Sequence, residues 1–236
     1  SRNACSRAAP CYALPAQPGG DSVRADASEL TAPPAPADVC IVGSGAAGLT
    51  LAARCAALGL EVLVLEAGGP NPDPAVQDAY AGQVADPRVH WPLDTYRVRA
   101  LGGTTALWGG RSIPFDPIDF EPRPWVAHSG WPIGYDEVAR YYPAAMEAAE
   151  AGAFDHTPSA PIVPGLDGEW LHTTIERFSR PTNFWTRYGP QLTAAANVRI
   201  LTHAPVTAIR LAPDGNSVDH LEIRAPDGTS WPVRAR

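Results

Sequence analysis

A glycine-rich turn that follows a short apolar segment constrains the fold of this chain more than any other feature. Residues 39–42, Val-Cys-Ile-Val, have the length and composition of a buried parallel β-strand. Gly43, Gly45 and Gly48 follow at once in the spacing G-x-G-x-x-G. A strand that runs directly into such a turn is typical of the start of a β-α-β unit.

The residues after the turn complete this unit. A helical pattern runs from about residue 46 to residue 58 and ends at Gly59, a residue type that favours helix C-termini. A second apolar strand is expected over 61–65, and it ends in Glu66. Strand, turn, helix, second strand and terminal acid in this order predict an α/β fold with a parallel sheet.

Each glycine of the turn has a physical role in binding a dinucleotide. Gly43 permits the tight turn off the strand, Gly45 lets a pyrophosphate approach the backbone, and Gly48 lets the helix pack closely on the sheet. The helix then presents its unpaired N–H groups and its positive dipole end to the phosphates. A glycine-rich turn in an unrelated α/β domain is the alternative, and the complete unit around the motif disfavours it.

Glu66 lies eighteen residues after Gly48, at the carboxyl end of the second strand. An acidic side chain at this place accepts hydrogen bonds from ribose hydroxyl groups. Its negative charge disfavours a 2′-phosphate, and therefore NADP. We expect that replacing Glu66 by alanine weakens dinucleotide binding and leaves the fold largely intact.

The charge of the chain bears on its partners. The 236 residues carry a formal net charge of −7 and contain no basic run, so nucleic acids and anionic membrane surfaces are not expected as partners. No stretch approaches eighteen consecutive apolar residues, so no membrane span is expected. A small-molecule substrate remains the expected partner.

The four cysteines do not form a ligand or disulfide pattern. Cys40 lies in the first expected strand and Cys55 in the first expected helix, where small thiols are ordinary core residues. No C-x-x-C or Cys/His spacing is present, so the sequence supports neither a metal site nor a disulfide framework. A reduced, cytoplasmic setting is the expectation from this pattern.

The remainder of the chain alternates loops with short elements. Residues 1–36 are rich in Ala, Pro, Gly and Ser without apolar periodicity, and they are expected to form a disordered leader. Further elements are expected in this order: a helix over 135–151, a strand-like segment over 170–178, a helix over 188–195, a strand over 198–202, and strands over 206–211, 218–224 and 230–235. Two Pro-Asp-Gly turns separate the last three strands and predict an antiparallel meander.

A second glycine-rich segment spans residues 97–111, RVRALGGTTALWGGR. Its two glycine pairs bracket small residues and one tryptophan, Trp108. Such a loop exposes backbone N–H groups and lets a flat ring lie close to the main chain. The apolar residues at its centre indicate that it covers something, whereas a flexible surface loop would be polar.

Several of these motifs together resemble the glucose–methanol–choline (GMC) family of oxidoreductases. They are the β-α-β unit, its EAGG ending at residues 66–69, GGTTALWGGR, SIPFDPIDFEPRPW and SGWPIGYDEVARYY. The resemblance is greatest to bacterial members near the pyranose oxidases and sugar dehydrogenases, and it covers residue 37 to the end. It implies non-covalent FAD as cofactor and oxidation of a CH–OH group of a sugar or another alcohol by hydride transfer to flavin N5.

The resemblance also implies which residues contact FAD. The pyrophosphate contacts are Gly43, Ser44, Gly45, Ala46, Ala47 and Gly48. Glu66 and the neighbouring Ala67 lie at the adenosine ribose, and the backbone of Val206 meets the adenine. Gly103, Thr104 and Thr105 lie against the flavin end, with Arg99 and Trp108 nearby. Some relatives link the flavin covalently through a histidine at the position of Leu107, which cannot form that bond.

The motifs and the resemblance together predict the fold and the domain boundaries of the chain. The expected fold is an FAD/NAD(P)-binding Rossmann-like domain with an antiparallel β-meander insert, plus part of an α+β substrate domain. The expected parts are the leader at 1–36, the first part of the FAD-binding domain at 37–112, a cap or substrate-domain part at 113–194, and the meander of the FAD domain at 195–236.

No catalytic residue is assigned. The resemblance implies a catalytic histidine beyond Arg236, and none of the six histidines present has a matching context: His90, His128, His156, His172, His203 and His220. We therefore expect an N-terminal part of a longer enzyme that is inactive by itself. Another FAD-dependent oxidase or monooxygenase, or a non-catalytic nucleotide-binding fragment, remains the alternative. The substrate and the electron acceptor stay open.

Overall fold

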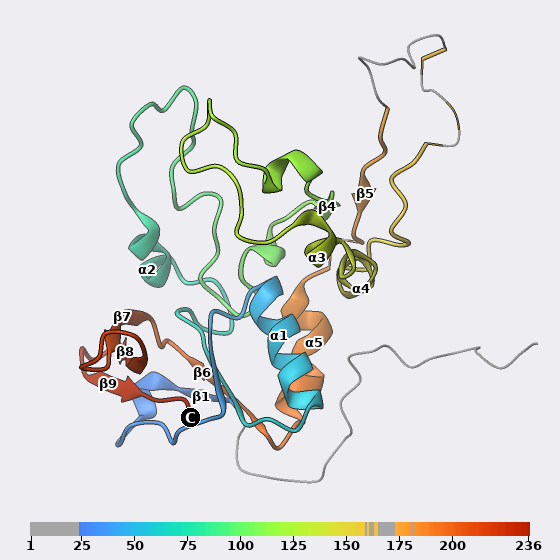
Figure 1. Ribbon diagram of the computed structural model, residues 1–236. Helices are drawn as coiled ribbons and strands as arrows, with labels where there is room; N and C mark the ends of the chain where they lie inside the picture. Colours follow the sequence, from blue (N-terminus) through green and yellow to red (C-terminus); the bar gives the residue numbers. More distant parts are fainter. Residues whose placement is uncertain (1–23, 159, 161–162, 165–172, 181) are drawn as a thin grey trace, which may run out of the picture. The chain divides into compact units, whose positions relative to one another are not determined.

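The computed structural model describes residues 24–158, 160, 163–164, 173–180 and 182–236. The chain divides into two compact units: the first holds the residues up to Leu107 together with Asn183–Arg236, and the second holds Trp108–Thr182 (Figure 1). The predicted domain boundaries at residues 112 and 195 stay predictions.

A four-stranded parallel sheet forms the centre of the first unit. Its order is β1-β6-β3-β2, with β1 at Arg24–Asp26, β2 at Val39–Val42, β3 at Val62–Leu65 and β6 at Val198–Thr202. Every residue of β3 is buried, because neighbours cover this strand on both faces and both edges. The predicted α/β fold with a parallel sheet is confirmed.

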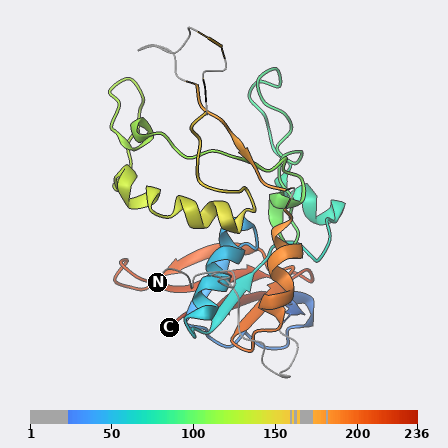
Figure 2. The same ribbon diagram turned by 90° about the vertical axis from the view of Figure 1, so that its right-hand side faces the viewer.

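Two helices lie side by side on one face of this sheet, α1 at Ala46–Ala57 and α5 at Phe184–Thr193 (Figures 1 and 2). The inner face of α1 consists of small and aliphatic residues, and Leu49 is fully buried. Small side chains on this face let the helix approach the strands closely.

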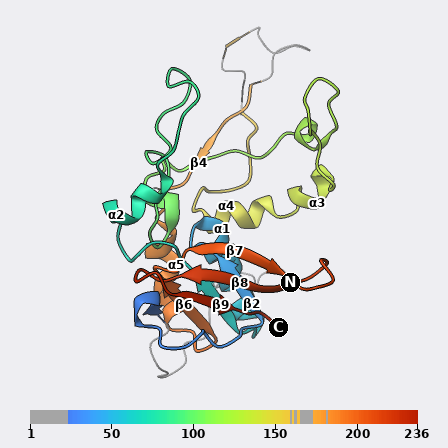
Figure 3. The ribbon, with the colours of Figure 1, turned by 90° about the vertical axis from the view of Figure 1, so that its left-hand side faces the viewer.

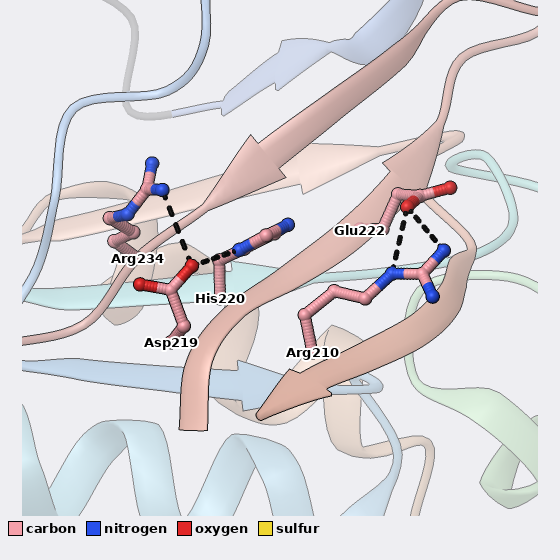
Figure 4. Close-up of polar contacts among 5 residues, drawn as sticks. All are labelled: Arg210, Asp219, His220, Glu222 and Arg234. Atoms are coloured by element: carbon pink, nitrogen blue, oxygen red, sulfur yellow. Dashed lines mark hydrogen bonds and ion pairs between the residues drawn. The ribbon is translucent and has the colours of Figure 1, made fainter. Parts of the chain in front are cut away.

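An antiparallel meander forms the third layer, on the opposite face of the sheet (Figure 3). Its strands are β7 at Val206–Leu211, β8 at Val218–Arg224 and β9 at Ser230–Val233. Ile223 and Val233 pack in one buried cluster with Leu63 and Leu65 of β3. On the meander, Arg210 pairs with Glu222, and His220 and Arg234 both point to Asp219 (Figure 4).

Residues 24–36 belong to the fold, although the sequence predicts a disordered leader there. Residues 24–26 pair with β6 as the edge strand β1, and the 3-10 turn Ala27–Glu29 follows, with Ala27 buried in the meander cluster. Arg199 also donates hydrogen bonds to the carbonyls of Ala35 and Pro36. A three-residue strand with one buried alanine carries too short an apolar pattern for its sequence to reveal it.

The second unit contains short elements joined by long loops. Its described elements are β4 at Arg111–Ser112, paired antiparallel with β5 at Arg177–Phe178, the 3-10 turn Pro117–Phe120, α3 at Tyr135–Ala139 and α4 at Tyr142–Ala148. Phe120 is buried among Phe115, Trp131 and Tyr135, with ring centroids 5.5–6.1 Å away. Of the strand-like segment predicted over 170–178, residues 170–172 lie outside the described residues.

The helix predicted over 135–151 is interrupted, and the predicted second helix begins earlier than expected. Helices α3 and α4 are separate because Pro143 lacks an N–H group and its ring disfavours helical geometry in the preceding turn. Helix α5 begins at Phe184 because the Asn183 side chain accepts hydrogen bonds from the N–H groups of Trp185 and Thr186.

The carboxylate of Asp26 fastens β1 to the end of β6. Burial disfavours its charged form, but hydrogen bonds from Ser28 and from His203 outweigh that effect and hold the pKa of Asp26 below its ordinary value of 3.8. Because the pKa is lower in the folded state, the contribution of Asp26 to stability is present above pH 3.8 and is lost as the pH falls through the folded-state value.

We predict that Asp26→Asn lowers the free energy of unfolding by about 1 kcal/mol at pH 6 and by much less at pH 3. Urea denaturation at both pH values measures the difference, with Asp78→Asn, a change on an exposed turn, as the control. An equal loss at both pH values would show that the charge of Asp26 is not what stabilises β1.

Candidate cofactor-binding site

The glycine turn leaves the first turn of α1 open. Gly43 has a left-handed backbone with φ 91° and donates its N–H to the Leu65 carbonyl at 2.8 Å. Gly45 is the N-cap of α1 and makes no side-chain cap, and a Cβ atom added there would meet nothing within 4 Å. Ala46 and Ala47 follow as the first helical residues. Free helix N–H groups beside open space fit an anionic group such as a pyrophosphate.

Gly48 is the point where α1 comes nearest to the turn. A Cβ atom added at Gly48 would lie 1.9 Å from the Gly43 carbonyl oxygen and 3.4 Å from Cγ2 of Ile41. Only a residue without a side chain allows the helix to begin this close to the strand. Gly48 therefore maintains the shape of the turn.

Glu66 lies at the end of β3 and holds the glycine turn in place. Its side chain is buried, and Oε2 accepts hydrogen bonds from the Ser44 N–H at 2.9 Å and the Ser44 hydroxyl at 2.6 Å. Its Oε1 accepts from the Gly68 N–H at 2.8 Å. A carboxylate offers about four lone-pair sites, and three of them accept these hydrogen bonds.

This geometry changes the expectation for the alanine variant of Glu66. Removing the carboxylate would leave the N–H groups of Ser44 and Gly68 without their acceptor, and an unsatisfied buried donor costs about 1–3 kcal/mol. Glu66→Ala is therefore expected to lower fold stability as well as cofactor affinity. The spacing of the motif did not reveal that the same carboxylate organises the turn.

The second glycine-rich segment packs directly on the first. The Gly102 N–H donates to the Ser44 carbonyl at 3.1 Å, and a Cβ atom added at Gly103 would lie 3.1 Å from Cα of Gly45. Likewise, a Cβ atom added at Gly68 would lie 1.9 Å from the Arg99 carbonyl oxygen. Backbone therefore contacts backbone where the two segments meet.

The two threonines of this segment make different contacts. The Thr105 hydroxyl donates to the Gly102 carbonyl at 2.6 Å and accepts from the Phe184 N–H at 3.1 Å, so it links the turn to the start of α5. Thr104 is exposed, and its hydroxyl oxygen accepts from the Val98 N–H at 3.4 Å. The predicted flavin contacts of both residues stay predictions.

The other predicted contact residues are distributed as follows. The Arg99 guanidinium lies over the Tyr80 ring at 5.1 Å, and its buried Nε has no hydrogen-bond partner among the described residues, which also fits an anionic ligand.

Val206 begins β7, two residues after Ala204, whose N–H donates to the Glu66 carbonyl. Trp108 belongs to the second unit, where its indole N–H donates to the Thr182 carbonyl at 3.0 Å.

His203 lies at this site, although the sequence assigned it no role. It follows β6 directly with a left-handed φ of 50°, and its N–H donates to the Gly68 carbonyl at 2.9 Å. Its Nδ1 is 2.5 Å from Oδ2 of Asp26, and its ring lies against Gly69. The signal for it was its place at the carboxyl end of a parallel strand, where ligands of α/β folds bind.

The described residues offer no metal site, and the thiol of Cys40 is not activated. No group of three or more His, Cys, Asp or Glu side chains among them could hold a metal ion. Burial raises the pKa of Cys40 to about 11, so its thiol stays protonated at neutral pH. Among the helices that the structure describes, none has the length and apolar character needed to cross a membrane.

A model of the FAD dependent oxidoreductase family matches residues 38–230, and the chain therefore belongs to this family. FAD is the cofactor of the family, and the open helix start and the glycine turn fit its anionic pyrophosphate.

Two curated relatives match part of this chain. Paromamine 6'-oxidase of Streptomyces fradiae is 37% identical over an alignment of 119 positions that covers 44% of this chain and 21% of that protein. The 6'''-hydroxyparomomycin C oxidase of Streptomyces lividus is 33% identical over an alignment of 116 positions that covers 44% of this chain and 21% of that protein. The chain thus spans about a fifth of the length of the curated relatives that it matches.

Solved structures show the same fold. Pyridoxine 4-oxidase from Mesorbium loti superposes with a TM-score of 0.50 at 22% identity, over 83% of this chain and 48% of that one. A formate oxidase superposes with a TM-score of 0.51 at 17% identity, over 87% of this chain and 45% of that one. The predicted resemblance to GMC oxidoreductases is confirmed, and at these identities the superpositions show the fold alone.

The environments of Gly45 and Gly48 give a matched pair of variants. Gly45→Val places its side chain in open space, so we predict an unchanged melting temperature of the apoprotein and at least a tenfold loss of FAD affinity. Gly48→Ala drives a methyl group into the Gly43 carbonyl, so the apoprotein itself should be destabilised. Thermal unfolding and FAD titration measure both effects. FAD affinity equal to wild type in Gly45→Val would contradict the assigned pyrophosphate position.

Proposed function

We propose that this chain forms the FAD-binding part of an oxidoreductase that oxidises a CH–OH group of a sugar or a related alcohol. The observation that carries the proposal is the junction of three segments in the first unit, namely the glycine turn, the buried Glu66 and the segment around Gly102. These segments surround the open start of α1, which is the place that suits a pyrophosphate.

The names of the two curated relatives support the substrate class. One is an oxidase of paromamine at its 6' position, and the other an oxidase of 6'''-hydroxyparomomycin C. Both matches exceed 30% identity over the aligned part of this chain. We carry over from them a sugar-like substrate with an oxidisable hydroxyl group.

In this proposal the residues of the chain bind and orient the cofactor. The N–H groups at the start of α1 hold the pyrophosphate, with backbone contacts from Ser44, Ala46 and Ala47. The free lone pair of Glu66 accepts a hydrogen bond from a ribose hydroxyl group, beside Ala67, and the backbone of Val206 meets the adenine. Gly103, Thr104 and Thr105 lie against the flavin end, with Arg99 and Trp108 nearby. When bound, FAD supplies a hydride acceptor at N5 of its ring system.

We assign no catalytic base to this chain. Among the described histidines, Nδ1 of His203 and Nδ1 of His220 each face an aspartate. Nδ1 of His90 lies 2.6 Å from the Trp91 carbonyl oxygen, and Nδ1 of His156 lies 2.8 Å from the Ile175 carbonyl oxygen. These contacts suit structural roles. We therefore propose that the 236-residue chain holds FAD without turning over an alcohol.

The proposal includes non-covalent attachment of the flavin. Leu107, a residue that is 62% exposed, takes the position at which some relatives carry a linking histidine, and its side chain has no nucleophilic atom. FAD should therefore be released when the protein is denatured.

We predict a flavin absorption spectrum for the purified protein, and a yellow supernatant after acid precipitation in which the released compound is FAD. Anaerobic addition of sugars with free hydroxyl groups should bleach the flavin of the protein made from its complete reading frame, and should leave the flavin of the 236-residue chain oxidised. Colour retained in the pellet would contradict the role assigned to Leu107. A folded protein that takes up no FAD would refute the proposed function.

A further inference from the structure

A short helical turn before the second glycine-rich segment holds that segment by its main chain. The turn consists of α2 at Pro74–Gln77 and the 3-10 turn Asp78–Tyr80. Nε2 of Gln77 donates to the carbonyl of Asp94 at 2.8 Å and to the carbonyl of Arg97, and its Oε1 accepts from the Arg99 N–H at 3.1 Å. One side-chain amide thus bridges three main-chain groups.

The bridge closes a long irregular loop at its base. Residues 81–98 contain no helix or strand, and Figure 1 shows α2 where this loop begins. Loops of this length are uncommon unless they are functional, and their ends are brought together only at a cost in chain entropy. Gln77 holds the base of the loop together, because it fixes residues 94–99 relative to α2.

Backbone contacts of residues 99–102 connect Arg99 to the glycine turn. The Arg99 carbonyl lies against Gly68, and the next residue, Ala100, forms a parallel bridge with Gly69. The Leu101 N–H donates to the Gly69 carbonyl at 3.0 Å. Gly102 then donates to the turn at Ser44, so each residue from 99 to 102 contacts the EAGG segment or the glycine turn.

The same helical turn supports the Arg99 side chain. The Tyr80 ring lies 5.1 Å from the Arg99 guanidinium carbon and 5.9 Å from that of Arg97. Gln77 therefore fixes the backbone of Arg99 while Tyr80 fixes its guanidinium, with the orphaned Nε held beside them.

We propose that Gln77 is a positioning residue for the cofactor site. It clamps residues 94–99 so that residues 99–103 already lie against the glycine turn before FAD binds, which raises the affinity for FAD. This inference rests on the proposed function, since it needs FAD at the start of α1. Preorganisation of this kind raises affinity because the entropy cost of ordering the segment is met during folding and does not oppose FAD binding.

The test compares two replacements of Gln77 with a control. Gln77→Met keeps the length of the side chain and removes all three hydrogen bonds, whereas Gln77→Glu keeps an acceptor for Arg99 but removes the donors to Asp94 and Arg97. Gln83→Met is the matched control, because Gln83 is an exposed glutamine in the same loop. Dissociation constants for FAD come from titration of each apoprotein, followed by flavin fluorescence.

We expect both Gln77 variants to bind FAD about tenfold more weakly than wild type, and Gln83→Met to stay within about twofold. The melting temperature of each apoprotein should stay close to that of wild type, and limited proteolysis should cut the Gln77 variants within residues 81–98 faster than wild type.

Two outcomes would overturn the positioning role of Gln77, and a third would instead overturn the proposed function. Unchanged FAD affinity in both Gln77 variants refutes the positioning role. A lowered apoprotein melting temperature with unchanged affinity refutes it too, because Gln77 would then serve the fold alone. A wild-type protein that binds no FAD refutes the proposed function itself, so the two failures are distinguishable.

Discussion

The buried carboxylate of Glu66 is the interaction on which the cofactor site depends. A buried charge is tolerated only where hydrogen bonds satisfy it, and here three donors from the two adjoining turns do so. Two of them belong to Ser44, in the middle of the glycine turn, and the third to Gly68 just after β3. Glu66 therefore fixes the turn that connects β2 to α1. The N–H groups at the start of α1 are thus oriented before any ligand binds.

Around this carboxylate, neighbouring segments pack through main-chain atoms, whereas other parts of the fold pack through side chains. Gly48, Gly68 and Gly103 each lie where an added Cβ atom would contact main-chain atoms of a neighbouring segment at 3.1 Å or less. Gly45 differs, because its missing side chain leaves space that the protein itself does not fill. The first three glycines thus allow the close approach of the segments, and in the proposed function Gly45 keeps the start of α1 accessible to the cofactor.

The sequence predicted the parts of the fold that depend on local patterns. Apolar runs and the spacing of Gly43, Gly45 and Gly48 located β2, α1 and β3, and the Pro-Asp-Gly turns located the meander. Local patterns failed where one residue decided the outcome, as at Pro143, which separates α3 from α4, and at Asn183, which caps α5.

The contacts that complete the site could not be predicted from sequence. Gln77 and His203 act through hydrogen bonds with distant main-chain groups, and main-chain groups carry no residue-specific pattern. The second role of Glu66 was hidden for the same reason, since its donors at Ser44 and Gly68 are largely main-chain N–H groups. Only the folded chain brings these groups together.

Hydrogen exchange with and without FAD tests the central claim most directly, because it reports on individual backbone N–H groups. FAD should slow exchange in residues 43–48, 66–69 and 99–105, and should leave the β7–β8 turn at residues 212–217 unchanged. Protection confined to other segments, with residues 43–48 exchanging equally fast in both states, would contradict the assignment of FAD to the start of α1.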